Sequence, residues 1–89
     1  MGYHVYILKS DQNYSYVGQT SDLCDRLPRH FNNRSKYTKN KGNWRLEISH
    51  EVATRSEAVK LERKLKKMKN VEKAIKHLRM LNAQKEKKA

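Results

Sequence analysis

The spacing of the apolar residues changes partway along this chain of 89 residues, and the change limits the folds that the chain can adopt. Short runs rich in β-branched and aromatic residues predict strands at residues 3–9, 13–19 and 44–52. Apolar residues at helical spacing then predict a helix that begins after Thr54 and a second one that begins after Asn70. We therefore expect an α/β fold of the α+β type, in which a three-stranded antiparallel sheet is flanked by helices.

Local signals predict how these elements begin and end. The polar residues 10–13 form a short connection between the first two strands, which favours an antiparallel hairpin. Residues 54–57 (TRSE) match a capping box at a helix start, and Asn70 can cap the next helix. Residues 23–31 carry apolar side chains at four-residue spacing and predict a further helix. We expect that helix to be kinked or shortened at Pro28, because proline removes a backbone hydrogen bond.

The length is that of one small domain, so we expect residues 1–83 to fold as a unit and residues 84–89 to form a frayed basic tail. Cys24 is the only cysteine, which excludes an intramolecular disulfide and a zinc site built from several cysteines. We expect it to be a small buried hydrophobe. No apolar run approaches the roughly 20 residues that span a bilayer, and residues 1–10 lack the pattern of a signal peptide. A cytoplasmic protein without a membrane segment is therefore expected.

The net charge of +12 and the pI of about 10.0 predict a polyanionic partner. Twelve basic and three acidic residues lie between Lys60 and Ala89, so this part carries a net charge of +9. Solubility alone requires a net charge of only about 2 to 8 in a small domain, which favours contact with phosphates. The side chains expected to contact nucleic acid are Arg34, Lys36, Lys39, Lys41, Lys60, Lys64 and Lys67.

Five polar side chains are candidates for chemistry because the predicted elements bring them near one another. Tyr6 and Tyr16 lie on the two strands of the hairpin, so their phenols can approach each other. Arg26 and His30 stand at i and i+4 and therefore share one helix face. Glu62 lies at the margin of the apolar stripe of its helix, about 60° from Leu65 at roughly 100° per residue. An acidic group in such a position among many cations suggests a binding role.

Several of these residues also have a simpler structural interpretation. Tyr6 and Tyr16 can be cross-strand packing partners, and His30 can be a cation that stabilises a helix C-terminus. Glu62 can form an i to i+4 ion pair with Lys66. The residues alone leave these alternatives open.

The order of these segments resembles that of the GIY-YIG nuclease family, over residues 3 to about 69. Residues 4–6 (HVY) stand where the family has Gly-Ile-Tyr, and residues 16–18 (YVG) stand for Tyr-Ile-Gly. A single tripeptide would carry little weight, but five segments in order at compatible spacing are hard to obtain by chance. The match is closest to the small single-domain bacterial members. The other matching segments are residues 22–30, residues 36–38, and residues 53–58 with Glu62.

The resemblance implies a metal-dependent endonuclease that hydrolyses phosphodiester bonds in nucleic acid, with DNA ranked ahead of RNA and the choice left open. It implies one Mg²⁺ or Mn²⁺ ion bound through Glu62, since a hard cation can take a single carboxylate together with waters and substrate phosphate. Arg26 would hydrogen-bond the phosphate oxygens, and His30 would assist it or orient water. Tyr6 or Tyr16 would activate or position the attacking water, with Tyr6 ranked first as the base.

Two other functions fit the same charge distribution. The first is a catalytically inactive nucleic-acid-binding module on the same scaffold, whose basic helices hold the phosphate backbone without reading sequence. The second is a protein-interaction domain that uses these helices to bind an acidic partner. The sequence specifies neither the physiological substrate nor the oligomeric state.

Overall fold

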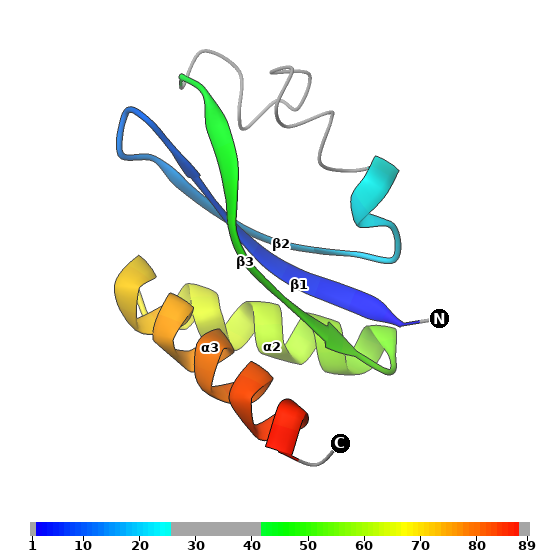
Figure 1. The fold of residues 1–89 in the computed structure, drawn as a ribbon. Coiled ribbons are helices and arrows are strands. Elements are labelled where there is room, and N and C mark those ends of the chain that lie inside the picture. The colour runs from blue at the N-terminus through cyan, green and yellow to red at the C-terminus, as the bar shows by residue number, and fades with distance from the viewer. Residues whose placement is uncertain (1, 26–41, 88–89) are drawn as a thin grey trace.

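The computed structural model describes residues 2–25 and 42–87, and this part of the chain contains a three-stranded sheet and two long helices (Figure 1). Residues 23–25 are also helical, whereas the remainder of the helix expected at residues 23–31, Pro28 included, lies outside the described residues. The order of elements is the predicted one, and the α+β fold class is confirmed. The elements are β1 (Tyr3–Ser10), β2 (Ser15–Thr20), β3 (Trp44–Val52), α2 (Arg55–Lys67) and α3 (Val71–Lys87).

The sheet has the order β2-β1-β3, so the first strand lies in the centre and both of its neighbours run antiparallel to it. Tyr6 of β1 stands opposite Gly18 of β2 and Ser49 of β3. The register with β3 shifts after Ile7, which leaves Glu47 as an extra residue in a β-bulge. The predicted antiparallel hairpin of β1 and β2 is therefore confirmed, and β2 is an edge strand.

The turn between β1 and β2 is held by side chains that accept backbone hydrogen bonds. Ser10 Oγ accepts from the backbone N–H groups of Gln12 and Tyr14, each at 3.2 Å. The Asp11 carboxylate accepts from the Asn43 backbone N–H at 3.0 Å and from the Asn43 side-chain amide at 3.3 Å. These contacts tie the start of β3 to the hairpin turn, although more than 30 positions separate them in the sequence.

Alternation along β1 gives each face of the sheet its own cluster of buried side chains. Val5 and Ile7 face α2 and α3, which lie side by side on one face (Figure 1), and pack against Ala58, Leu65 and Leu78. On the other face the buried side chains are those of Tyr6, Leu8 and Trp44, with the partly buried Tyr16 and Leu23 against them. The candidate tyrosines thus lie on the face that α2 and α3 do not cover.

Both predicted helix caps are present. Thr54 Oγ1 accepts from the backbone N–H of Glu57 at 3.2 Å at the start of α2. The Glu57 carboxylate returns to the backbone N–H of Ala53 at 3.3 Å, one residue before the position that a standard capping box uses. Asn70 Oδ1 accepts from the backbone N–H groups of Glu72 and Lys73 and begins α3.

The helix α3 extends to Lys87, through Gln, Lys and Glu residues that all favour the helix, and the expected domain bounds and basic tail stay predictions. One expectation about the chain is wrong. Cys24 is exposed rather than buried. The reason is that the neighbouring Leu23 takes the position against the Tyr6 cluster, so the next residue points elsewhere. Neither helix of the described chain is long and apolar enough to cross a membrane.

Candidate functional site

Tyr6 and Tyr16 form a packed pair across the hairpin. Their ring centroids are 6.1 Å apart and the ring planes are tilted by 43°. The register places Tyr6 opposite Gly18 and Tyr16 opposite Leu8, so the two rings project from the same face of the sheet. Tyr6 is fully buried, whereas Tyr16 is half-buried. The prediction that the hairpin brings the two phenols together is confirmed, and the same geometry satisfies the packing alternative.

Gly18 provides the space that this pair needs. A Cβ atom at residue 18 would lie 2.8 Å from Tyr6 Oη and 2.7 Å from Tyr16 Cε2, both closer than a carbon atom can approach without displacing them. Glycine is therefore required here for close approach and not for an unusual backbone conformation. The sequence motif contained Gly18, but only the strand register shows which atoms it accommodates.

Glu62 and Lys66 form the ion pair that the i to i+4 spacing predicted. Lys66 Nζ lies 3.9 Å from Glu62 Oε1, at the outer limit for such a pair. The Glu62 side chain is 21 % exposed and the Lys66 side chain is 57 % exposed. At this distance the ion pair holds the Glu62 carboxylate only weakly.

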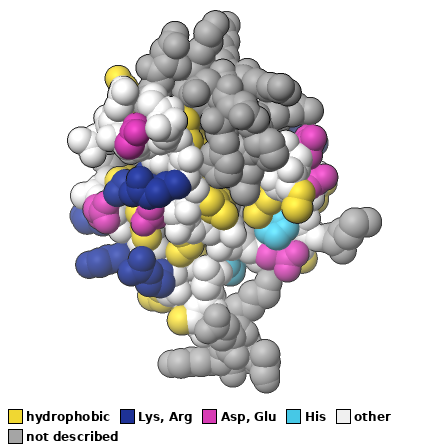
Figure 2. All heavy atoms as spheres, turned by 45° about the horizontal axis from the view of Figure 1, so that its top comes forward, with side chains coloured by type: hydrophobic (Ala, Val, Ile, Leu, Met, Phe, Trp, Pro, Cys, Tyr) yellow, Lys and Arg dark blue, Asp and Glu magenta, His cyan; other side chains and the backbone are white. Residues whose placement is uncertain are grey.

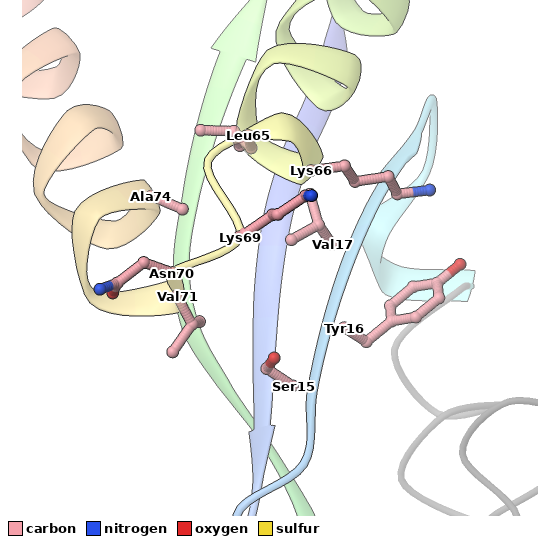
Figure 3. Close-up of a pocket in the computed structure, with 9 residues that line it drawn as sticks. All are labelled: Ser15, Tyr16, Val17, Leu65, Lys66, Lys69, Asn70, Val71 and Ala74. Atoms are coloured by element: carbon pink, nitrogen blue, oxygen red, sulfur yellow. The ribbon is translucent and has the colours of Figure 1, made fainter.

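A cavity of about 560 Å³ lies between β2, the end of α2 and the start of α3 (Figure 3). Its lining combines polar groups with an apolar floor. In Figure 3 the Lys66 side chain extends from α2 toward β2 and Tyr16, and the Lys69 ammonium group lies between Lys66 and Asn70. The lining residues are Ser15, Tyr16, Val17, Leu65, Lys66, Lys69, Asn70, Val71 and Ala74.

The cavity connects the two halves of the candidate site. Tyr16 belongs to the tyrosine pair and lines the cavity, and Lys66 lines it from the opposite side while pairing with Glu62. Glu62 lies one turn before Lys66 on α2, so its carboxylate lies on the side of the helix that adjoins β2. Tyr16 of the edge strand and Lys66 of α2 thus share the cavity, with Tyr6 behind Tyr16 and Glu62 one helical turn before Lys66.

The donor set fits a hard divalent cation that keeps most of its water. No cluster of three or more His, Cys, Asp or Glu side chains that could hold a metal ion occurs in residues 2–25 and 42–87. Glu62 is thus a single-carboxylate candidate, partly exposed and beside a cavity. Mg²⁺ is commonly bound in this way, through one or two carboxylates with waters and a substrate phosphate.

The predicted nucleic-acid contacts on α2 lie apart from this site. Lys60, Lys64 and Lys67 are exposed, and at roughly 100° per residue they stand between about 140° and 160° around the helix from Glu62. Figure 2 shows Lys and Arg side chains gathered on one side of the molecule with Asp and Glu side chains among them. On the side of the molecule shown there, acidic side chains partly compensate the positive charge.

Within residues 2–25 and 42–87, the cations that line the cavity are Lys66 and Lys69, and neither was predicted to contact nucleic acid. Lys66 was predicted only as the ion-pair partner of Glu62, and no role was predicted for Lys69. The i to i+4 spacing was the available signal for Lys66. Nothing in the sequence pattern showed that Lys69, just after α2, would meet β2.

Other predicted site residues lie outside the part of the chain that the structure describes, and their assignments stay predictions. They are Arg26, His30, Arg34, Lys36, Lys39 and Lys41.

A second polar cluster lies between β3 and α3, on the opposite edge of the sheet. Asn82 Nδ2 donates to the Ser49 carbonyl at 3.0 Å, so Asn82 Oδ1 accepts from Nδ1–H of His50 at 2.6 Å. Burial, the charge of Lys64 and the charge of His50 together hold the pKa of His77 below its usual value. These groups stabilise the packing of α3 on β3 and lie away from the tyrosine pair.

Comparisons with known proteins identify the family of the chain. A family model described as the GIY-YIG catalytic domain matches residues 2–76. The solution NMR structure of a UPF0213 protein from Bacillus halodurans is 31 % identical in sequence, with a TM-score of 0.47. That match covers 74 % of this chain and 71 % of the other. No curated protein is similar enough to match the chain.

Proposed function

The chain belongs to the GIY-YIG nuclease family, and on this basis we propose that it is a divalent-metal-dependent endonuclease that hydrolyses phosphodiester bonds in DNA. The observation that carries the proposal is the arrangement along β2. Tyr16 of the tyrosine pair and Lys66, the partner of Glu62, line one cavity. A phosphodiester at this edge would lie next to Tyr16 and Lys66, with the Glu62 carboxylate one helical turn further along α2.

Glu62 is the residue that would hold the metal ion. One Mg²⁺ or Mn²⁺ ion, when bound, supplies charge stabilisation for the phosphoryl oxygens during hydrolysis. The partial exposure of the Glu62 carboxylate and its loose pairing with Lys66 favour this role. Lys66 balances the Glu62 charge in the absence of a cation and can turn toward a phosphate, because its side chain is long and largely exposed.

The two tyrosines have separable roles. Tyr16 is half-buried and is one of the residues that line the cavity, so it is the more exposed tyrosine of the pair. Tyr6 is fully buried and packs against Tyr16, so it also fixes the position of the Tyr16 ring. Comparing the cleavage rates of Tyr6→Phe and Tyr16→Phe identifies the general base, which is the hydroxyl whose removal costs the larger factor.

Arg26 is proposed to stabilise the charge that builds on the phosphate, with His30 assisting it or orienting water. A guanidinium group can place two parallel donors on one phosphate, which an ammonium group cannot. Arg26→Lys should therefore abolish most turnover, since removing one such preorganised donor typically lowers the rate by about 10² to 10³. Near wild-type cleavage by the lysine variant would remove Arg26 from this role.

The proposal is tested with a cleavage panel of plasmid DNA, single-stranded DNA, branched DNA and RNA. Each substrate is incubated with the protein in Mg²⁺, in Mn²⁺ and in EDTA. We expect cleavage of DNA in the presence of either metal and none in EDTA. Failure to cut any substrate in any metal, or undiminished cutting in EDTA, would contradict the proposal.

The Glu62–Lys66 pair also favours a second function, a nucleic-acid-binding module without catalysis. If the ion pair stays closed when nucleic acid binds, the carboxylate is neutralised and is not available to a metal. Such a protein would bind DNA as strongly as a nuclease with the same charges, and its affinity would fall with salt in the same way. It would cut no substrate, and added Mg²⁺ would not change its affinity for DNA.

A further inference from the structure

The cavity beside β2 joins an apolar floor to a cationic rim. Val17, Leu65 and Val71 contribute apolar side chains, whereas Lys66 and Lys69 bring two ammonium groups (Figure 3). The described chain carries no acidic side chain in the lining of this cavity. Such a combination suits a ligand with one anionic part and one flat apolar part.

The backbone at Lys69 shows that this lysine is held at a cost in stability. Its φ is +53°, in the left-handed region that glycine usually occupies after a helix. A residue with a Cβ atom is disfavoured in this conformation, and lysine can form no local hydrogen bond that would offset the penalty, as asparagine can. The conformation places the Lys69 ammonium group in the cavity.

The size of the cavity limits the ligand. A volume of about 560 Å³ lies in the range of sites for small molecules, and a phosphate group alone would leave most of it unfilled. A nucleotide supplies both parts, because its phosphate can bind the ammonium groups while its base covers the apolar floor. The faces of all four bases are flat and largely apolar, so each can pack on a floor of aliphatic side chains.

We propose that this cavity is a nucleotide subsite, in which Lys66 and Lys69 bind a backbone phosphate next to the scissile one and the attached nucleoside packs on Val17, Leu65 and Val71. The proposal rests on the proposed nuclease function, because it assigns the phosphate to the substrate strand. It extends that function by naming how the strand is positioned beside Glu62. Lys66 is shared by the two sites, since it lines the cavity and pairs with Glu62.

The test is a titration of the ¹⁵N-labelled protein with thymidine 5′-monophosphate, followed by NMR in metal-free buffer. Thymidine and inorganic phosphate are titrated separately. We expect saturable shifts of the backbone amides of Ser15, Tyr16 and Val71 with the nucleotide. Thymidine and phosphate should each bind at least about tenfold more weakly, since each supplies only one of the two contacts.

Matched variants identify the groups that bind. Lys66→Gln and Lys69→Gln should each weaken nucleotide binding by about tenfold, because each removes one charged hydrogen-bond donor. Lys69→Arg should restore most of the affinity. Lys76→Gln is the control, because Lys76 is an exposed lysine of α3 that does not line the cavity, and its loss lowers the net charge equally.

Several results would overturn the subsite. They are shifts confined to other parts of the chain, equal affinities for phosphate and nucleotide, or equal weakening by Lys76→Gln and Lys69→Gln. The titration does not depend on cleavage. If the protein binds the nucleotide as described but cuts no DNA, the nuclease function is contradicted and the subsite stands. If the protein cuts DNA but does not bind the nucleotide, only the subsite is contradicted.

Discussion

Replacing Gly18 with alanine tests the geometry on which the tyrosine pair depends. The added methyl group would lie 2.7 Å from Tyr16 Cε2, 2.8 Å from Tyr6 Oη and 3.0 Å from Tyr6 Cζ. Tyr6 is fully buried and cannot turn toward solvent, whereas Tyr16 is half-buried. We therefore expect the Tyr16 ring to be displaced away from residue 18 and from Tyr6.

The sign of the change in unfolding free energy shows whether the added methyl group of Gly18→Ala collides with the two tyrosine rings. Without a steric conflict, Gly→Ala in a strand usually raises stability by about 0.4 to 1 kcal/mol, because alanine restricts the unfolded chain. Overpacking of a filled site instead costs about 1 to 3 kcal/mol. In a domain of this size each kcal/mol corresponds to roughly 4 to 8 °C in Tm, so Gly18→Ala should lower Tm by at least roughly 4 °C.

Thermal unfolding followed by circular dichroism measures this change, and cleavage of plasmid DNA measures the effect on the site. We expect the cleavage rate to fall by about 10², the cost of a displacement near 1 Å in a catalytic site. In a Tyr16→Leu background the ring atom nearest the methyl group is absent, so the added cost of Gly18→Ala should shrink by at least about 0.5 kcal/mol. A Gly18→Ala protein as stable and as active as wild type would refute the reasoning.

Three further predictions follow from other groups. The pKa of His77 is lowered in the folded state, so the unfolded state binds protons more readily. The free energy of unfolding should therefore fall as the pH drops below about 6.5. The variant His77→Gln should flatten that pH dependence, as measured by urea titrations at pH 5 and 7. Lys69→Gly should raise the free energy of unfolding by about 0.5 to 1 kcal/mol, since glycine accepts the left-handed backbone, and unchanged or lower stability would show that the lysine is not strained. Binding to duplex DNA should weaken as salt is added, and a plot of log K for binding against log salt should have a slope of roughly −4 to −5, because four to six phosphate contacts are expected. A slope near zero would contradict nucleic-acid binding and would favour an acidic protein as the partner.

The fold could be predicted from local patterns because each element carries its own signal. A run of β-branched and aromatic residues marked the first strand and alternating residues marked the other two, while Thr54 and Asn70 marked the helix starts with side chains that accept backbone N–H groups. The central position of β1 and the bulge at Glu47 were not predicted. Both depend on how β3 returns to pair with β1, which the residues of one strand do not determine.

The candidate site was predictable where its parts are close in the sequence. The hairpin brought Tyr6 and Tyr16 together, and one helical turn paired Glu62 with Lys66. The cavity was not predictable, because Lys69 meets β2 only through the packing of α2 on the sheet and through a left-handed residue at the helix end.

The proposed nuclease activity is tested most directly by Glu62→Gln, which keeps the shape of the side chain and removes the charge that a divalent cation needs. Glu72→Gln is the matched control, since Glu72 is also paired with a lysine, Lys9 at 2.9 Å, but lies outside the site. Plasmid cleavage is measured in Mg²⁺ for both variants, together with Tm. We predict that Glu62→Gln abolishes metal-dependent cleavage with Tm unchanged, while Glu72→Gln cuts like wild type. Cleavage by Glu62→Gln at the wild-type rate would contradict the assignment of the metal to Glu62 and, with it, the proposed mechanism.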